Sequence, residues 1–145
     1  GNYMFDQSYI PIMLKQSRCE KGITVQHLMA KDSLYMTDAD REIILNEVRL
    51  AEETRIIITH GTDSIVNTSV TLGQNIKDKT VVLLGAMVPY NEPNSDALFN
   101  LGFAVSSART LPHGVYVCMQ GVVFDWYNVK KNRALMKFQV MNGGE

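Results

Sequence analysis

Three short apolar blocks, separated by stretches with helical spacing, place the strongest constraint on how this chain can fold. The blocks are rich in the β-branched and aliphatic residues that are typical of buried strands, and they are Arg55–Thr59, Thr80–Leu84 and Val115–Met119. The segments between them are long enough for the helical crossovers that parallel strands need. The alternation therefore predicts an α/β domain in which a parallel sheet lies between layers of helices.

Local signals add the remaining elements. Thr37, followed by acidic residues, predicts the start of a helix with Ile43, Ile44 and Val48 on one face. Ser64 to Gln74 and the residues after Asn94 or Ser95 have helical spacing too. These helices fill the crossovers.

The first forty residues carry fewer such signals. Ser8 to Gln16 predicts a short helix with Pro11 in its first turn. Ile23, Val25 and Leu28 predict a strand that ends in a loop at Asp32-Ser33. The far end of the chain gives less: Gln120 to Lys131 predicts a strand-like return and then a polar loop, and the tail from Met141 is expected to fray.

Length and composition fit one domain, residues 1–145, because 46% of the residues are hydrophobic and can form a core, with the eight methionines as dispersed fillers. A net charge of −1 gives no basic field for nucleic acid or a membrane surface, so a small polar ligand is expected. Two cysteines, with Cys118 inside an apolar block, predict reduced thiols and a cytoplasmic protein. No segment predicts a membrane span, and three scattered histidines predict no metal site.

The end of the first apolar block is the candidate site. Thr59 is followed by the turn His60-Gly61 and then by Thr62 and Asp63, where a helix begins. Ligands of parallel sheets bind beyond the carboxyl ends of the strands. Thr62 could attack a carbonyl there, with Asp63 holding its base or a substrate amine. The alternative is that these residues only cap the helix, with His60 fixing the turn.

Four motifs, in the same order and spacing, resemble the asparaginase family of bacterial and archaeal type. They are the loop KDSLYMTDADR, the strand end ITHGTDS, the run KTVVLLGAMVP with the later SDALFNLGFAV, and VYVCMQGVVFDWYNVKKN. The resemblance covers about Ala30 to Asn132. It implies a three-layer α/β/α sandwich with a mainly parallel, flavodoxin-like sheet, equivalent to the N-terminal domain of that family.

The resemblance also implies an activity and a set of roles. The activity is hydrolysis of the side-chain amide of asparagine, with glutamine or a related amide as a further substrate, through a threonine nucleophile and without metal or cofactor. Thr62 becomes the nucleophile, Lys131 its base, and Asp63 the orienting acid and amine anchor. The other implied contacts are with the substrate. Ser33 binds its α-carboxylate, and the Ala86 carbonyl accepts from its amide. Asp32, beside Ser33, and Tyr3, on the mobile loop, are further substrate-binding residues.

The departures from the family also carry expectations. The family's TGGTI segment on its first strand is missing from this sequence, which begins Gly1-Asn2-Tyr3 without a Met, so upstream residues are expected to be absent. Leu34 stands where secreted members have a glutamine. The second domain of full-length members is also expected to be absent, and the expected exposed sheet edges favour a homo-oligomer.

Two other functions stay open on the sequence. The same pocket could bind an amino acid or a partner protein without turnover, and recovery or true absence of the TGGTI strand would separate that function from an enzyme. Lys130 is the competing assignment for Lys131, because adjacent lysines commonly form a solvated loop. A phosphate-binding module is disfavoured, since no loop has a glycine-rich phosphate cradle.

Overall fold

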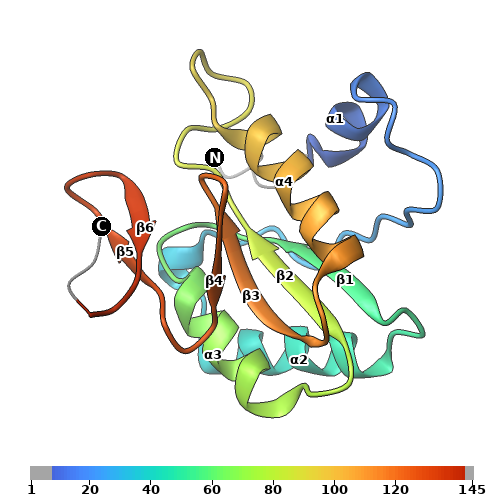
Figure 1. Cartoon of the computed structure of the whole chain (residues 1–145), viewed down its shortest axis with the longest axis vertical. Coiled ribbons are helices and arrows are strands. Elements are labelled where there is room, and N and C mark those ends of the chain that lie inside the picture. Colours follow the sequence, from blue (N-terminus) through green and yellow to red (C-terminus); the bar gives the residue numbers. More distant parts are fainter. Residues whose placement is uncertain (1–7, 143–145) are drawn as a thin grey trace.

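The computed structural model describes residues 8–142, and a four-stranded sheet is its centre (Figure 1). The strands are β1 (Arg55–Thr59), β2 (Thr80–Leu84), β3 (Gly114–Met119) and β4 (Val122–Asp125), in that order across the sheet. β1, β2 and β3 run parallel, and β4 returns antiparallel to β3. The three predicted strands are confirmed, and so is the strand-like return after them.

Helices cover both faces of this sheet (Figure 1). α4 (Ala97–Thr110) packs on β1, β2 and β3 from one face, while α3 (Ile65–Asn75) packs on β3 and β2 from the other and carries α2 (Asp38–Leu50) beside it. The short helix α1 (Ile10–Gln16) has Pro11 in its first turn, as predicted, and buries Met13 and Leu14. The predicted α/β/α layering is therefore confirmed.

Burial differs sharply between the middle and the edge of the sheet. All five residues of β2 are buried, because strands flank it on both sides and helices cover both of its faces. In β1 the three isoleucines are only half-buried and the end residues are exposed, since β1 pairs with β2 alone among the described residues. The hydrophobic core is thus centred on β2 and β3.

Beyond β3 the chain makes two hairpins. Gln120 and Gly121 both have positive φ angles (50° and 78°), the backbone of a two-residue hairpin turn, and they join β3 to β4. β5 (Lys130–Asn132) and β6 (Lys137–Gln139) then form a separate antiparallel pair. Lys131 was predicted in a polar loop. It lies on a strand instead, because pairing with β6, which sequence analysis missed, makes the segment regular.

The strand predicted from Ile23, Val25 and Leu28 is wrong. Residues 23–32 have no regular secondary structure, and Val25 and Leu28 are 47% and 37% exposed. A strand needs a neighbour that takes up its backbone N–H and C=O groups, and no strand of the described chain pairs with this segment. Its apolar residues therefore lack a sheet to join.

The cap of α2 is confirmed and its buried face is partly corrected. Thr37 accepts from the Asp40 backbone N–H, and the Asp40 carboxylate accepts from the Thr37 N–H, so the two form a capping box. Ile44 and Val48 are buried as predicted, whereas Ile43 is 48% exposed and Leu45 takes its place in the core. The N-cap of α4 is Asp96 and not Asn94 or Ser95 as predicted, although the Ser95 hydroxyl accepts from the Ala97 N–H.

No helix of residues 8–142 is both long and apolar enough to cross a membrane. Cys118 is buried, as its apolar block predicts, and burial raises the pKa of its thiol to about 11.

Candidate active site

The loops after β1 and β2 touch each other through glycines. The His60 N–H donates to the Leu84 carbonyl, which extends the strand pairing by one residue. A Cβ on Gly85 would lie 2.3 Å from the His60 carbonyl oxygen and 3.0 Å from the Thr62 methyl carbon. Only glycine fits at Gly85 without movement of the backbone beside it. The two loops are thus packed into one rigid rim at the carboxyl ends of the strands.

The buried side chain of His60 stabilises this rim through two hydrogen bonds. Its Nδ1 lies 2.7 Å from the Gly61 carbonyl oxygen, which can only accept, so Nδ1 carries the proton. Nε2, also at 2.7 Å, then accepts from the Thr68 hydroxyl. Burial lowers the pKa of the imidazole and keeps it neutral. The hydrogen bond predicted to fix the turn is present.

The sequence-predicted hydroxyl and amine meet at this rim. Lys131 Nζ lies 2.8 Å from Thr62 Oγ1, although the two residues are 69 positions apart. Thr62 is half-buried, and the Lys131 side chain is only 15% exposed. Lys130 is exposed, because successive residues of a strand point to opposite faces. The structure therefore separates the two lysines, and Lys131 is the one beside the hydroxyl.

Asp63 binds two cations. Its Oδ1 lies 3.0 Å from Lys131 Nζ and 2.5 Å from Arg133 Nη1, and Arg133 Nη2 reaches its backbone carbonyl at 3.4 Å. The hydrogen bond from Arg133 and then that from Lys131 lower the pKa of the carboxyl, which is ionised at neutral pH. Sequence analysis missed Arg133. A strand assignment at Lys131 could have found it, since residues two apart share a face.

Ser33 lies against the same rim and Asp32 turns away from it. Ser33 is buried, and its Oγ accepts from the Ser64 N–H at 2.8 Å while its carbonyl accepts from the Ser64 hydroxyl. The hydroxyl proton of Ser33 is still available to a ligand. Asp32 accepts instead from the Leu34 N–H and caps the short helix η2 (Ser33–Tyr35). The structure thus brings only Ser33 to the rim.

Ala86 follows β2 in the loop beside Thr62. Asn100, buried on α4, donates to the Gly85 carbonyl and to Asp96, and its own carbonyl oxygen accepts from the Gln120 N–H. Asp96 in turn accepts from the backbone N–H groups of the two residues after Ala86. No hydrogen bond within the described residues uses the Ala86 carbonyl oxygen. This loop is therefore held in place by Asn100 and Asp96.

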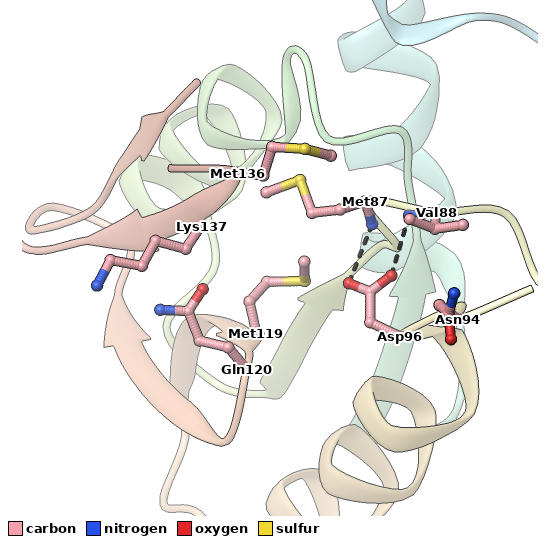
Figure 2. A pocket seen from close by; sticks show the side chains of 8 residues that line it. All are labelled: Met87, Val88, Asn94, Asp96, Met119, Gln120, Met136 and Lys137. Atoms are coloured by element: carbon pink, nitrogen blue, oxygen red, sulfur yellow. Dashed lines mark hydrogen bonds between the residues drawn. The ribbon is translucent and has the colours of Figure 1, made fainter. Parts of the chain in front are cut away.

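A hollow of about 330 Å³ lies between this loop and the β5–β6 hairpin. Figure 2 shows Met87, Met119 and Met136 on its walls, with Gln120 and Lys137 on the hairpin side and Asp96 opposite them. The methionines were predicted to be dispersed through the core, and these three gather around one hollow instead. Thr62 and Lys131 are not part of its lining, so the hollow does not contain the hydroxyl–amine contact.

Tyr3, the remaining predicted contact, lies outside the described residues. Among residues 8–142, no three His, Cys, Asp or Glu side chains gather in a way that could hold a metal ion.

A hydroxyl, an amine and a carboxylate thus converge at the strand ends of an α/β/α sandwich. Comparison with known proteins places that fold in a family. The family model described as "Asparaginase, N-terminal" matches residues 6–143. This chain belongs to the asparaginase family.

Individual relatives agree with that assignment. The L-asparaginase of Thermococcus kodakarensis is 41% identical over 91 residues, which are 60% of this chain and 28% of that protein. Its solved structure superposes with a TM-score of 0.81 and 32% identity, over 90% of this chain and 43% of that one. A glutamyl-tRNA(Gln) amidotransferase subunit of Methanococcus vannielii is 36% identical over 85 residues, 58% of this chain and 20% of that protein. The chain therefore spans less than half the length of these relatives.

Proposed function

We propose that this chain is an amidohydrolase that releases ammonia from L-asparagine or a closely related carboxylic amide, with Thr62 as the nucleophile. The contact of 2.8 Å between Lys131 Nζ and Thr62 Oγ1 carries the proposal. An alcohol attacks an amide only when a base is in hydrogen-bond reach of its proton, and an amine is such a base. Family membership supports the reaction class.

The steps follow from the positions of the side chains. Lys131, which carries its proton in the resting site, first releases that proton to solvent. The neutral amine then takes the Thr62 proton while Thr62 Oγ bonds to the amide carbon. The C–N bond then breaks, and the nitrogen leaves as ammonia with the proton that Lys131 returns. Water then attacks the resulting ester and gives a proton to Lys131, which passes it to the departing Thr62 Oγ, and the acid is released. Asp63 orients Lys131 through the contact of 3.0 Å.

The neighbouring groups suit a small amide that carries a carboxylate. The Ser33 hydroxyl proton can be donated to that carboxylate, and the Ala86 carbonyl can accept from the amide N–H₂. The N-terminus of α3 adds the positive end of a helix dipole beside Thr62. We assign these three groups to substrate binding, and Asp63 to the orientation of Lys131.

The test is a pair of threonine variants of this chain. Thr62→Val keeps the shape of the side chain and removes the hydroxyl, and it should lower ammonia release from asparagine by at least about a thousand-fold. Thr71→Val, at a half-buried position of α3 away from Lys131, is the matched control and should retain full activity. Intact mass measurement after acid quench should also show an acyl adduct in the unaltered chain and none in Thr62→Val. Equal activity of the two variants would contradict the assignment.

One observation favours a second function. An amidotransferase subunit is among the relatives, so the chain can instead be the amide-hydrolysing part of a larger assembly that passes ammonia on. That function predicts ammonia release that rises when a partner protein is added, whereas a free-standing amidohydrolase is fully active alone.

A further inference from the structure

The proposed site contains one feature that the proposed reaction does not use. Arg133 lies just past β5, two residues after Lys131, and its guanidinium contacts both the carboxylate and the backbone carbonyl of Asp63. The planar fork of arginine can hold two acceptors at once, which a lysine cannot do. Lys131 uses the same oxygen, Oδ1, of Asp63. One carboxylate is thus shared by two cations.

The charge of this cluster decides what it attracts. Lys131 and Arg133 supply two positive charges against one negative charge on Asp63, so the three groups sum to +1. Asp32, the nearest acid in sequence to the Ser33 side of the rim, is turned to the Leu34 N–H. The hydrogen bonds from Arg133 and Lys131 lower the pKa of Asp63, so its carboxyl is ionised at neutral pH. An incoming ammonium group would meet two like charges at the carboxylate that is meant to bind it.

We propose that Arg133 determines substrate specificity by occupying Asp63 in place of a substrate ammonium group. The preferred substrate is then an amide that carries a carboxylate and lacks a free ammonium group beside it, such as a deaminated or N-acylated relative of asparagine. This inference rests on the proposed function, because it assumes that the amide binds at Thr62. In place of the ammonium-binding role that the family resemblance implies, Asp63 then has an ion pair with Arg133.

The physical reason is a competition. A substrate ammonium group can reach Asp63 only after Arg133 has moved, and Arg133 is free to move because its side chain is 62% exposed. Displacing it costs a charge-assisted hydrogen bond and leaves two cations near each other. A substrate that carries a carboxylate but no ammonium group incurs neither cost, because Arg133 can stay on Asp63. It gains instead from the net positive charge of the cluster.

The experiment measures binding with two ligands that differ only in that group. Isothermal titration calorimetry is run at neutral pH with L-asparagine and with succinamate, which is asparagine without its α-ammonium group. The proteins are the unaltered chain, Arg133→Met and Lys130→Met. The last is the matched control, because Lys130 lies on the same hairpin, is exposed and does not contact Asp63.

We expect the unaltered chain to bind succinamate at least about five-fold more tightly than asparagine. Arg133→Met should tighten asparagine binding about five- to ten-fold without tightening succinamate, and Lys130→Met should leave the ratio unchanged. Tighter binding of asparagine by the unaltered chain, with the same ratio in Arg133→Met, would overturn this inference and leave the proposed function standing. If neither ligand bound, the proposed function would fall and this inference with it.

Discussion

The two sides of the candidate site are built in very different ways. The Thr62 side joins two strand ends through backbone contacts, with Gly85 against the His60 carbonyl and Gly61 against Ser33. The Lys131 side is the β5–β6 hairpin, whose two strands have three residues each and form a sheet separate from the main one. The hydroxyl is therefore held rigidly, whereas the amine is delivered by an element that can open.

Few contacts hold the β5–β6 hairpin in place. Phe138 is fully buried, and the Gln120 side chain makes two hydrogen bonds to its backbone, of 2.7 and 2.8 Å. The Asn128 side chain accepts from the Met141 N–H, and the remaining bonds run through Asp63 and Thr62. Opening of this hairpin would separate Lys131 from Thr62 without unfolding the sheet. Local openings of this kind need less energy than global unfolding.

The largest expected effect comes from the rigid side. Gly85→Ala places a Cβ 2.3 Å from a backbone oxygen, so strand ends have to move apart, and we expect a loss of about 3 kcal/mol in the free energy of unfolding. Gly102→Ala is the matched control, because nothing lies within 4 Å of its added Cβ in α4, and it should gain about 0.5–1 kcal/mol. Denaturant titration measures both. A loss below about 1 kcal/mol in Gly85→Ala would mean that this rim is as pliable as the hairpin.

The second effect isolates the hairpin. Gln120→Ala removes both side-chain hydrogen bonds to Phe138. Amide hydrogen exchange should then show that the free energy of opening of β5 and β6 is lower by about 1–2 kcal/mol, with little change at β2. Gln26→Ala, in the exposed segment before the short helix η2, should change neither region. Ammonia release should fall in Gln120→Ala, since Lys131 is then less often at Thr62. Equal protection at β5 in the two variants would show that the hairpin does not depend on this contact.

The smallest effect is the pH dependence of the contacts through Asp63. Hydrogen bonds from Arg133 and Lys131 lower the pKa of Asp63 below its usual value of 3.8. A lowered pKa means that the carboxylate stabilises the hairpin at all pH values above 3.8 and that this support is lost as pH falls through the folded value. Exchange protection at β5 should stay level down to about pH 4 and drop about two- to five-fold below it. Asp63→Asn should remove this step, and a step near neutral pH would contradict the assignment.

Local patterns in the sequence predicted the strands of the main sheet better than they predicted the segment before α2 or the buried face of that helix. The blocks Arg55–Thr59 and Thr80–Leu84 match β1 and β2 residue for residue, because short runs of β-branched and aliphatic residues favour strands. Burial was expected for both strands, but only β2 is fully buried. The strand predicted from Ile23 to Leu28 fails, since strand formation depends on a partner that local composition does not specify. Ile43 is exposed for a related reason: packing against a neighbour decides which face of a helix is buried.

The residues of the candidate site also divide into those that the local sequence predicted and those that it did not. Thr62 and Asp63 follow from their position after an apolar block, as every strand-end loop does in a parallel sheet. Their contact with Lys131 came from the resemblance to the asparaginase family and not from the residues around Lys131, which indicated a solvated loop. Arg133 was missed because its role depends on the β5–β6 hairpin, which brings Lys131 and the adjoining Arg133 to Asp63 and which the sequence analysis did not predict.

The most direct test is the pair of adjacent lysines. Lys131→Met removes the amine 2.8 Å from Thr62 Oγ1, whereas Lys130→Met makes the same chemical change on the opposite, exposed face of β5. With ammonia release from asparagine and from succinamate as the readout, we expect at least about a hundred-fold loss in Lys131→Met and near-normal rates in Lys130→Met. No release by the unaltered chain, or equal losses in the two variants, would contradict a role for Lys131 as the base of Thr62.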